Sequence, residues 1–306
     1  MKWRWPTIWS GERGGWWRVL VTLVLLQAGL RLGGVLSSLL VPESSRGTFN
    51  PINPATMKQA VQSFALLLPN LLALASLLAG IRFVHRKPVA CVFTDGRPFK
   101  VGLAFQSAAV WTLLTLVVTV VLPHGWQVLA RRASEVSAAW WPVLALSVCA
   151  TTVATSAVEE VLFRGYLQPR LGAWVRIRWV AVVIPAALFT LTHRGSSWPA
   201  YGGLAFAAVL WGTAAMRAGT LAPLIAMHAT NNALNALCYP NGSNAGVAWV
   251  GAMILVGKLV IWFGWLLWAT RRGPAEALAQ PDGAANRSQP VGQETNRTSP
   301  APGSGG

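Results

Sequence analysis

Eight long apolar runs restrict what this sequence can fold into. They cover residues 17–41, 61–81, 101–122, 139–167, 179–193, 201–216, 220–238 and 246–270. A helix needs about 20 apolar residues to cross the hydrocarbon core of a bilayer, and only the fifth and sixth runs are clearly short of that length. None of the runs alternates between apolar and polar residues as a membrane β-barrel requires. The sequence therefore predicts an all-α, polytopic membrane protein of about eight transmembrane helices.

The charge of the chain agrees with a membrane location. Charged residues make up 11% of the sequence, whereas a soluble protein carries about a quarter. The net charge of +16 does not indicate a nucleic-acid partner, because the basic residues lie in short loops between apolar runs. The three cysteines are far apart and match neither a metal site nor a disulfide framework.

The basic residues also predict the orientation. With eight spans, the two termini and the even-numbered connections share one side of the membrane, and most of the 25 Lys and Arg residues fall there. Positively charged loops stay in the cytoplasm, so both termini are expected to be cytoplasmic. Arg31 and Lys258 lie deeper, within spans, where they are expected to snorkel or to face a neighbouring helix. The alternative is that they line a wet cavity.

An acidic pair, Glu159 and Glu160, lies at the end of the fourth run. The chain has nine acidic residues, and only these two fall within an apolar run. An ionisable group at membrane depth costs about 2.5 kcal/mol or more and therefore marks a candidate functional site. Arg164 lies at i+4 from Glu160, a spacing that favours an ion pair. That pair could be purely structural, but it would still leave Glu159 unexplained, so we interpret Glu159 as a free base.

Three further polar residues lie in later runs. His193 ends the fifth run, and His228 and Asn232 share one helical face of the seventh. At 1.5 Å per residue, Glu159 and His228 each lie ~12 Å from the predicted cytoplasmic end of their span, whereas His193 lies ~21 Å in. A tilted fifth helix, or one that starts deeper, would remove this mismatch.

These groups suit hydrolysis of an acyl bond. A carboxylate in an apolar site can act as a general base, a histidine opposite it can hold the same water, and a second histidine with an amide can donate to an oxyanion. The runs contain no His-Glu-x-x-His motif, no aspartate and no Gly-x-Ser-x-Gly elbow, which argues against the corresponding intramembrane chemistries. A metal held by Glu and His stays open as an alternative, with zinc as the example.

The motifs resemble those of a known family. Glu159-Glu160-x-x-x-Arg164, Phe189-x-x-x-His193 and His228-x-x-x-Asn232 are similar to the three motifs of the CAAX-protease and bacteriocin-processing (Abi, CPBP) intramembrane endopeptidases, relatives of the type II CAAX prenyl endopeptidases. The similarity spans about residues 138–239. It implies a cavity among the fourth, fifth and seventh spans that opens to the cytoplasm. It also implies that Glu159 and His193 activate a water and that His228 and Asn232 form the oxyanion site.

The resemblance implies a glutamate-type endopeptidase without a cofactor, although such enzymes are often labelled metalloendopeptidases. The expected partners are the lipid bilayer and a peptide or protein substrate, either lipid-modified or membrane-bound. The expected location is a bacterial cytoplasmic membrane. A peptide-binding or immunity protein without catalysis is the alternative.

The chain is expected to divide into five segments. These are a cytoplasmic start (1–16), N-terminal spans (17–137), a catalytic core (138–240), a last span (241–272) and a disordered tail (273–306).

Overall fold

The structure, a computed structural model, describes residues 9, 15–40, 64–96, 98–121, 127, 138–193, 197–238 and 248–271. Within them every regular element is a helix, and the only strand-like feature is one isolated bridge between Thr94 and Thr220. The predicted all-α fold is therefore confirmed. The helices belong to one compact unit, Met1–Thr270. The predicted disordered tail and almost all of the predicted N-terminal segment lie outside the described residues.

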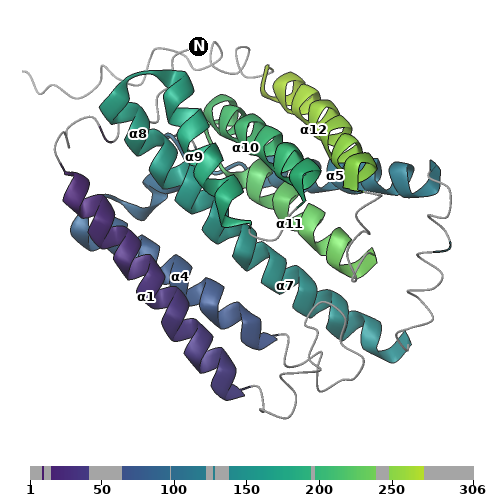
Figure 1. Ribbon diagram of the computed structural model, residues 1–306, viewed down its shortest axis with the longest axis horizontal. Helices are drawn as coiled ribbons and strands as arrows, with labels where there is room; N and C mark the ends of the chain where they lie inside the picture. The colour runs from purple at the N-terminus through teal and green to yellow at the C-terminus, as the bar shows by residue number, and fades with distance from the viewer. Residues whose placement is uncertain are drawn as a thin grey trace, which may run out of the picture. The chain divides into compact units, whose positions relative to one another are not determined.

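Each predicted run contains a helix (Figure 1). The helices are α1 (Trp16–Leu40), α4 (Leu67–Ala79) with its extension η3 (Gly80–Val84), α5 (Val101–Val121), α7 (Trp141–Glu160), which continues through η6 (Val161–Leu167) into α8 (Gln168–Val175), α9 (Arg178–Thr192), α10 (Trp198–Ala218), α11 (Ala222–Cys238) and α12 (Ala248–Arg271). Among the described residues, 6 helical stretches are long and apolar enough to cross a membrane. The other two are shorter, with 15 residues in α9 and 17 in α11.

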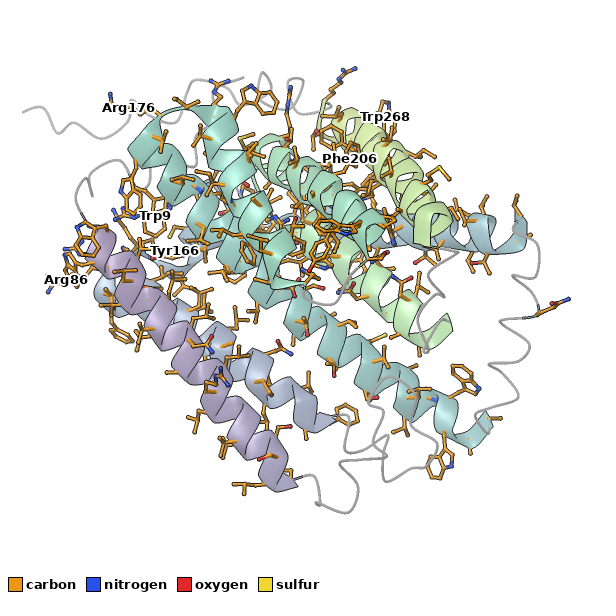
Figure 2. All side chains as sticks on the ribbon, in the orientation of Figure 1. Trp9, Arg86, Tyr166, Arg176, Phe206 and Trp268 are labelled. Carbon is orange, nitrogen blue, oxygen red and sulfur yellow. The ribbon has the colours of Figure 1, made fainter. Side chains whose placement is uncertain are left out.

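The fourth helix is longer than predicted. It continues past Leu167 to Val175 and ends where Arg176 adopts a left-handed conformation with φ 60°, so that α9 runs back beside α8. Figure 2 shows Arg176 at this turn. The predicted run stops just before Gln168-Pro169-Arg170, but these residues are buried within the helix. Gln168 Nε2 donates to the Gly212 carbonyl of α10 at 2.8 Å, which satisfies the buried amide.

Small residues let α1 and α4 pack closely. Gly29 and Gly33, spaced as in a Gly-x-x-x-Gly motif, are buried on α1. A Cβ at either position would collide with α4, with Ser76 and the Leu72 carbonyl for Gly29 and with the Pro69 backbone for Gly33. Association of membrane helices depends on such close backbone approach.

Helix α11 packs against α5, α7 and α10. At its start, the Pro223 carbonyl accepts a hydrogen bond from Ser107 on α5 at 2.7 Å, and Ser107 accepts one from Trp262 on α12 at 2.8 Å. Lys258 of α12 also faces α5, because its Nζ donates to Thr115 at 3.1 Å. Lys258 thus faces a neighbouring helix, as expected, while Arg31 is exposed.

Two π-helical segments, η3 and η6, meet between α7 and α8 of the fourth helix. His85, which caps η3, is joined to Tyr166 of η6 by a hydrogen bond of 2.8 Å between Nε2 and the hydroxyl. The Trp9 ring lies edge-on to both, at 5.3 Å from His85 and 5.7 Å from Tyr166, and Figure 2 shows Trp9 beside Tyr166. π-Helical turns often occur near functional sites, and η6 begins directly after Glu160.

The connection between α4 and α5 holds the start of α11. The Leu221 amide donates to the Phe93 carbonyl at 2.9 Å, and the Asp95 amide donates to the Gly219 carbonyl at 3.0 Å. An open, mostly apolar hollow of about 790 Å³ lies at this connection, lined by Ala90, Phe93, Thr94, Gly96, Pro98 and Phe99. It is separate from the motif residues, none of which line it.

Candidate active site

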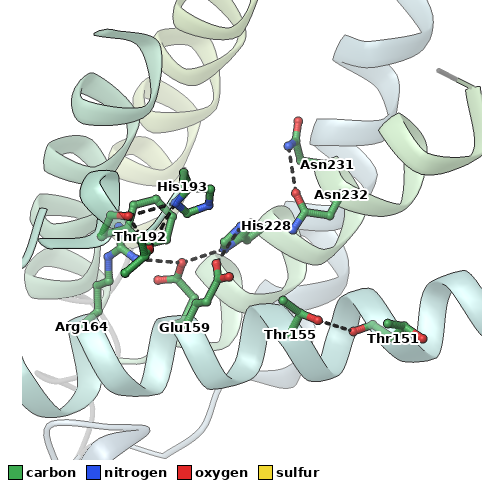
Figure 3. A network of polar contacts seen from close by, with 11 residues as sticks. Thr151, Thr155, Glu159, Arg164, Thr192, His193, His228, Asn231 and Asn232 are labelled. Carbon is green, nitrogen blue, oxygen red and sulfur yellow. Dashed lines mark hydrogen bonds and ion pairs between the residues drawn. The ribbon is translucent and has the colours of Figure 1, made fainter. Parts of the chain in front are cut away.

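Three helical segments bring the motif side chains together (Figure 3). Glu159 and Glu160 are the last two residues of α7, and Arg164 follows in η6. His193 directly follows α9, and His228 lies on α11. Figure 3 shows Glu159, His193 and His228 pointing toward one another. Glu159, His193 and His228 therefore lie close together, although they come from distant parts of the chain.

Continuation of the fourth helix removes the expected depth mismatch. Glu159 lies 16 residues before Val175, and His193 lies 15 residues after Arg178. At 1.5 Å per residue, the two are ~24 Å and ~22 Å from the turn that joins α8 and α9. The earlier comparison was wrong because it took Leu167 as the end of the helix.

Glu160 is the buried centre of the site. Its side chain is 0% exposed, and its Oε1 lies 3.3 Å from Arg164 Nη1. The same oxygen accepts a shorter hydrogen bond, 2.9 Å, from Nδ1 of His228. The i+4 spacing predicted the arginine contact, but the histidine contact crosses 68 positions in the sequence and was missed.

Glu159 has a different environment. Its side chain is 26% exposed, and its Oε2 lies 3.6 Å from Nε2 of His228, which is too long for a hydrogen bond but close enough for charge attraction. His228 therefore lies between the two carboxylates. This differs from the arrangement implied by the family, in which His228 serves the oxyanion rather than the glutamates.

His193 is held by its own helix end. Its Nδ1 donates to the carbonyl of Phe189, four residues earlier, at 2.9 Å. A carbonyl only accepts, so this bond places a proton on Nδ1 and makes Nε2 the ring nitrogen that is left to accept a hydrogen bond. The Phe189 and His193 rings are also in contact, with centroids 4.6 Å apart. Phe189 of the second motif thus fixes the histidine of the same motif.

Asn232 lies one helical turn beyond His228 on α11. Its side-chain oxygen accepts a long hydrogen bond, 3.4 Å, from the neighbouring Asn231. Figure 3 shows the two amides farther along the helix than the cluster of glutamates and histidines. Asn232 shares the helical face of His228, as predicted, but it borders the cluster rather than joining it.

Three aromatic rings lie around Arg164, those of Phe163, Phe189 and Trp211. Its guanidinium carbon lies 4.4 Å from the centroid of Phe189 and 5.3 Å from that of Trp211 on α10. Cation–π contacts of this kind stabilise a desolvated arginine by about 2 kcal/mol. Trp211 was not among the predicted site residues. Its signal is a tryptophan deep within a span, because tryptophan is enriched at membrane interfaces.

A metal ion would need several His, Cys, Asp or Glu side chains arranged around one point. In the part of the chain that the structure describes, no group of three or more His, Cys, Asp or Glu side chains is arranged to hold one. The Nδ1 nitrogens of both site histidines bond to protein oxygens, as the second ring nitrogen of a metal-bound histidine also commonly does. Treatment with a chelator tests the metal-dependent alternative.

Comparison with known proteins identifies the segment that carries this site. Residues 136–234 match the family described as type II CAAX prenyl endopeptidase Rce1-like. Neither the search of curated proteins nor that of solved structures gave a match. The matched segment starts just before α7 and includes all three motifs, while α1, α4, α5 and α12 lie outside it. Residues 136–234 are therefore similar to the Rce1-like type II CAAX prenyl endopeptidases, the group that the motifs also resemble.

Proposed function

We propose that this protein is an intramembrane endopeptidase that cleaves a peptide bond with a water activated by Glu159 and His193. The family match supports CAAX-type endopeptidase activity in general. The observation that carries the finer proposal is the convergence of Glu159, His193 and His228 from three helices (Figure 3). Ionisable side chains at membrane depth are costly, so their collection at one place favours chemistry over packing.

Glu159 and His193 supply two acceptors for one water. Glu159 is the carboxylate that is partly open, with 26% of its side chain exposed, and His193 offers Nε2 because Nδ1 is engaged with Phe189. A water that donates one hydrogen bond to each would be oriented and polarised. Glu159 then takes the proton as the water oxygen attacks the substrate carbonyl carbon.

Charge balance supports a protonated His228. Glu159 and Glu160 contribute two negative charges, and Arg164 supplies one positive charge beside them. An imidazolium at His228 would make the cluster neutral, which avoids an uncompensated charge in a low-dielectric site. Its Nδ1–H already donates to Glu160, and its Nε2–H would then face Glu159.

The same arrangement can serve the oxyanion. When Glu159 accepts the proton of the water it becomes neutral, and its attraction for His228 weakens. The Nε2–H of His228 is then free to donate to the negatively charged oxygen of the tetrahedral intermediate, with the Asn232 amide one turn away as a second donor. Collapse of the intermediate breaks the C–N bond, and Glu159 returns the proton to the leaving amine.

Cleavage of a fluorogenic prenylated CAAX peptide by the purified protein in lipid nanodiscs tests the function. We expect the wild type to cleave it and Glu159→Gln or His193→Ala to lower kcat by about 100-fold or more. Thr155→Val is the matched control, because Thr155 lies one turn before Glu159 and its hydroxyl bonds only within its helix in the described contacts. Full activity in Glu159→Gln would overturn the proposal.

Two further measurements, chelation and peptide binding, separate the proposed function from a metal-dependent enzyme and from a non-catalytic binding protein. A chelator should leave the rate unchanged if the carboxylate is the base, whereas a metal-dependent enzyme would lose activity and regain it with zinc. A peptide-binding or immunity protein would bind the labelled peptide without cleaving it, and Glu159→Gln would then leave the binding unchanged.

A further inference from the structure

Trp211 contacts the site from a helix that carries none of the motifs. It lies on α10, is buried, and stacks on the imidazole of His228, with centroids 4.6 Å apart and an angle of 32° between the rings. The same indole lies 5.3 Å from the guanidinium carbon of Arg164. One side chain of α10 thus contacts both side chains that bond to Glu160, His228 and Arg164.

Gly212, the residue after Trp211, ties the backbone beside this indole to a second helix. The Gly212 carbonyl accepts the hydrogen bond of Gln168, 2.8 Å long, and a Cβ at Gly212 would approach the Gln168 side chain to 2.8 Å. Gln168 lies one helical turn after Arg164 on the same continuous helix. The backbone beside Trp211 is therefore bonded to the helix that carries the glutamates and the arginine.

The indole acts through its ring face. Trp211 Nε1 is buried and has no hydrogen-bond partner in the described part of the chain, so the ring contributes no polar contact there. A flat ring against one face of the imidazole restricts rotation of His228 about its side-chain torsions. That rotation is what would exchange Nδ1 and Nε2 between Glu160 and Glu159.

We propose that Trp211 is a positioning residue: its stacking on His228 keeps Nδ1 on Glu160 and Nε2 toward Glu159, and its contact with Arg164 holds the arginine beside the same carboxylate. This inference rests on the proposed function. The proposal assigns α10 a direct part in the site, so that four helices rather than three determine its geometry.

Two substitutions test the role of the ring face. Trp211→Phe retains a flat ring and should keep kcat within about threefold, whereas Trp211→Leu should lower kcat by about 10- to 100-fold with little change in KM, as expected for misplacement of a catalytic group. Trp111→Leu is the matched control. Trp111 is equally buried, its Nε1 also lacks a partner among the described residues, and its ring lies 4.6 Å from the Lys258 amine.

Nitrogen NMR of ¹⁵N-histidine-labelled protein gives a readout that does not depend on activity. The chain has four histidines, and loss of signals in His228→Gln assigns those of His228. The two ring-nitrogen shifts of His228 should be the same in wild type, Trp211→Phe and Trp111→Leu. In Trp211→Leu they should move toward the average of exchanging ring orientations.

The kcat values and the His228 nitrogen shifts distinguish failure of the positioning role from failure of the proposed function. Unchanged His228 shifts in Trp211→Leu would overturn the positioning role, as would equal loss of kcat in Trp211→Leu and Trp111→Leu, which would indicate a general packing effect. A wild type that cleaves nothing would overturn the proposed function, while the NMR comparison would still decide whether Trp211 orients His228.

Discussion

Glu159 and Glu160 are adjacent in the chain, yet their side chains have different surroundings. Successive residues of a helix point about 100° apart, which directs Glu160 into the protein toward Arg164 and His228 and leaves Glu159 partly exposed. The Glu160 carboxylate is buried and bonded to Arg164 and His228, whereas 26% of the Glu159 side chain is exposed. The pair therefore divides into a buried member and a partly exposed one, and the second is the base of the proposed function.

Replacement of each glutamate by alanine should separate these contributions. Glu160→Ala leaves the buried Arg164 without its carboxylate, and loss of one partner of a buried ion pair costs about 3–5 kcal/mol. Glu159→Ala should change the free energy of unfolding by less than about 1 kcal/mol, because its carboxylate is partly solvated. SDS-titration unfolding measures both. Equal destabilisation by the two variants would contradict this division.

The sequence predicted the part of the site that depends on local spacing. The Glu160–Arg164 contact and the shared face of His228 and Asn232 follow from helical periodicity within one segment. The hydrogen bond of His228 to Glu160 and the stacking of Trp211 depend on how α7, α10 and α11 pack. No spacing rule within a single chain contains that information.

At the level of elements, the motif helices depend on a continuous hairpin. The chain runs unbroken from α7 through η6 to α8 and returns as α9, which sets Glu159 and His193 at nearly the same distance from the turn. Hydropathy predicted the runs but not this continuation, because Gln168 and Arg170 are polar. Within the folded chain both are buried, and Gln168 bonds to α10.

Packing of α1 on α4 offers a prediction with an internal control. Gly33 faces α4, whereas Gly34 has open space where its Cβ would be. Gly33→Ala should destabilise the protein by about 1–3 kcal/mol through overpacking. Gly34→Ala should be neutral or stabilising by up to about 1 kcal/mol, since alanine favours the helix. Unfolding in mixed micelles measures both, and similar effects would contradict the close α1–α4 contact.

At the scale of the molecule, helices outside the matched segment flank it (Figure 1). Helix α4 packs on α7, and α1 packs on α4, while α5 packs on α11. Helix α12 is tied to α5 by the Trp262–Ser107 hydrogen bond. The first three spans carry no motif, so no role was predicted for them. Their contacts with α7 and α11 indicate that they support the two helices that carry the glutamates and His228.

Orientation in the membrane is the remaining prediction, and it depends on the distribution of positive charge over the whole chain. The connection between α4 and α5 contains Arg86, Lys87 and Lys100, so the positive-inside rule assigns it to the cytoplasm. The next connection, between α5 and α7, is then external. Pro98, exposed in the first connection, and Ser134, in the second and outside the described residues, can each be changed to cysteine without altering any charge.

The labelling is done with Cys91, Cys149 and Cys238 replaced by alanine. In intact cells a membrane-impermeant maleimide should label Ser134→Cys at once and Pro98→Cys only after the membrane is permeabilised. The reverse pattern would mean that the basic loops are external. In that case the turn joining α8 and α9, on the same side as the α4–α5 connection by the count of spans, would also be external, and a substrate would have to reach Glu159 from outside the cell.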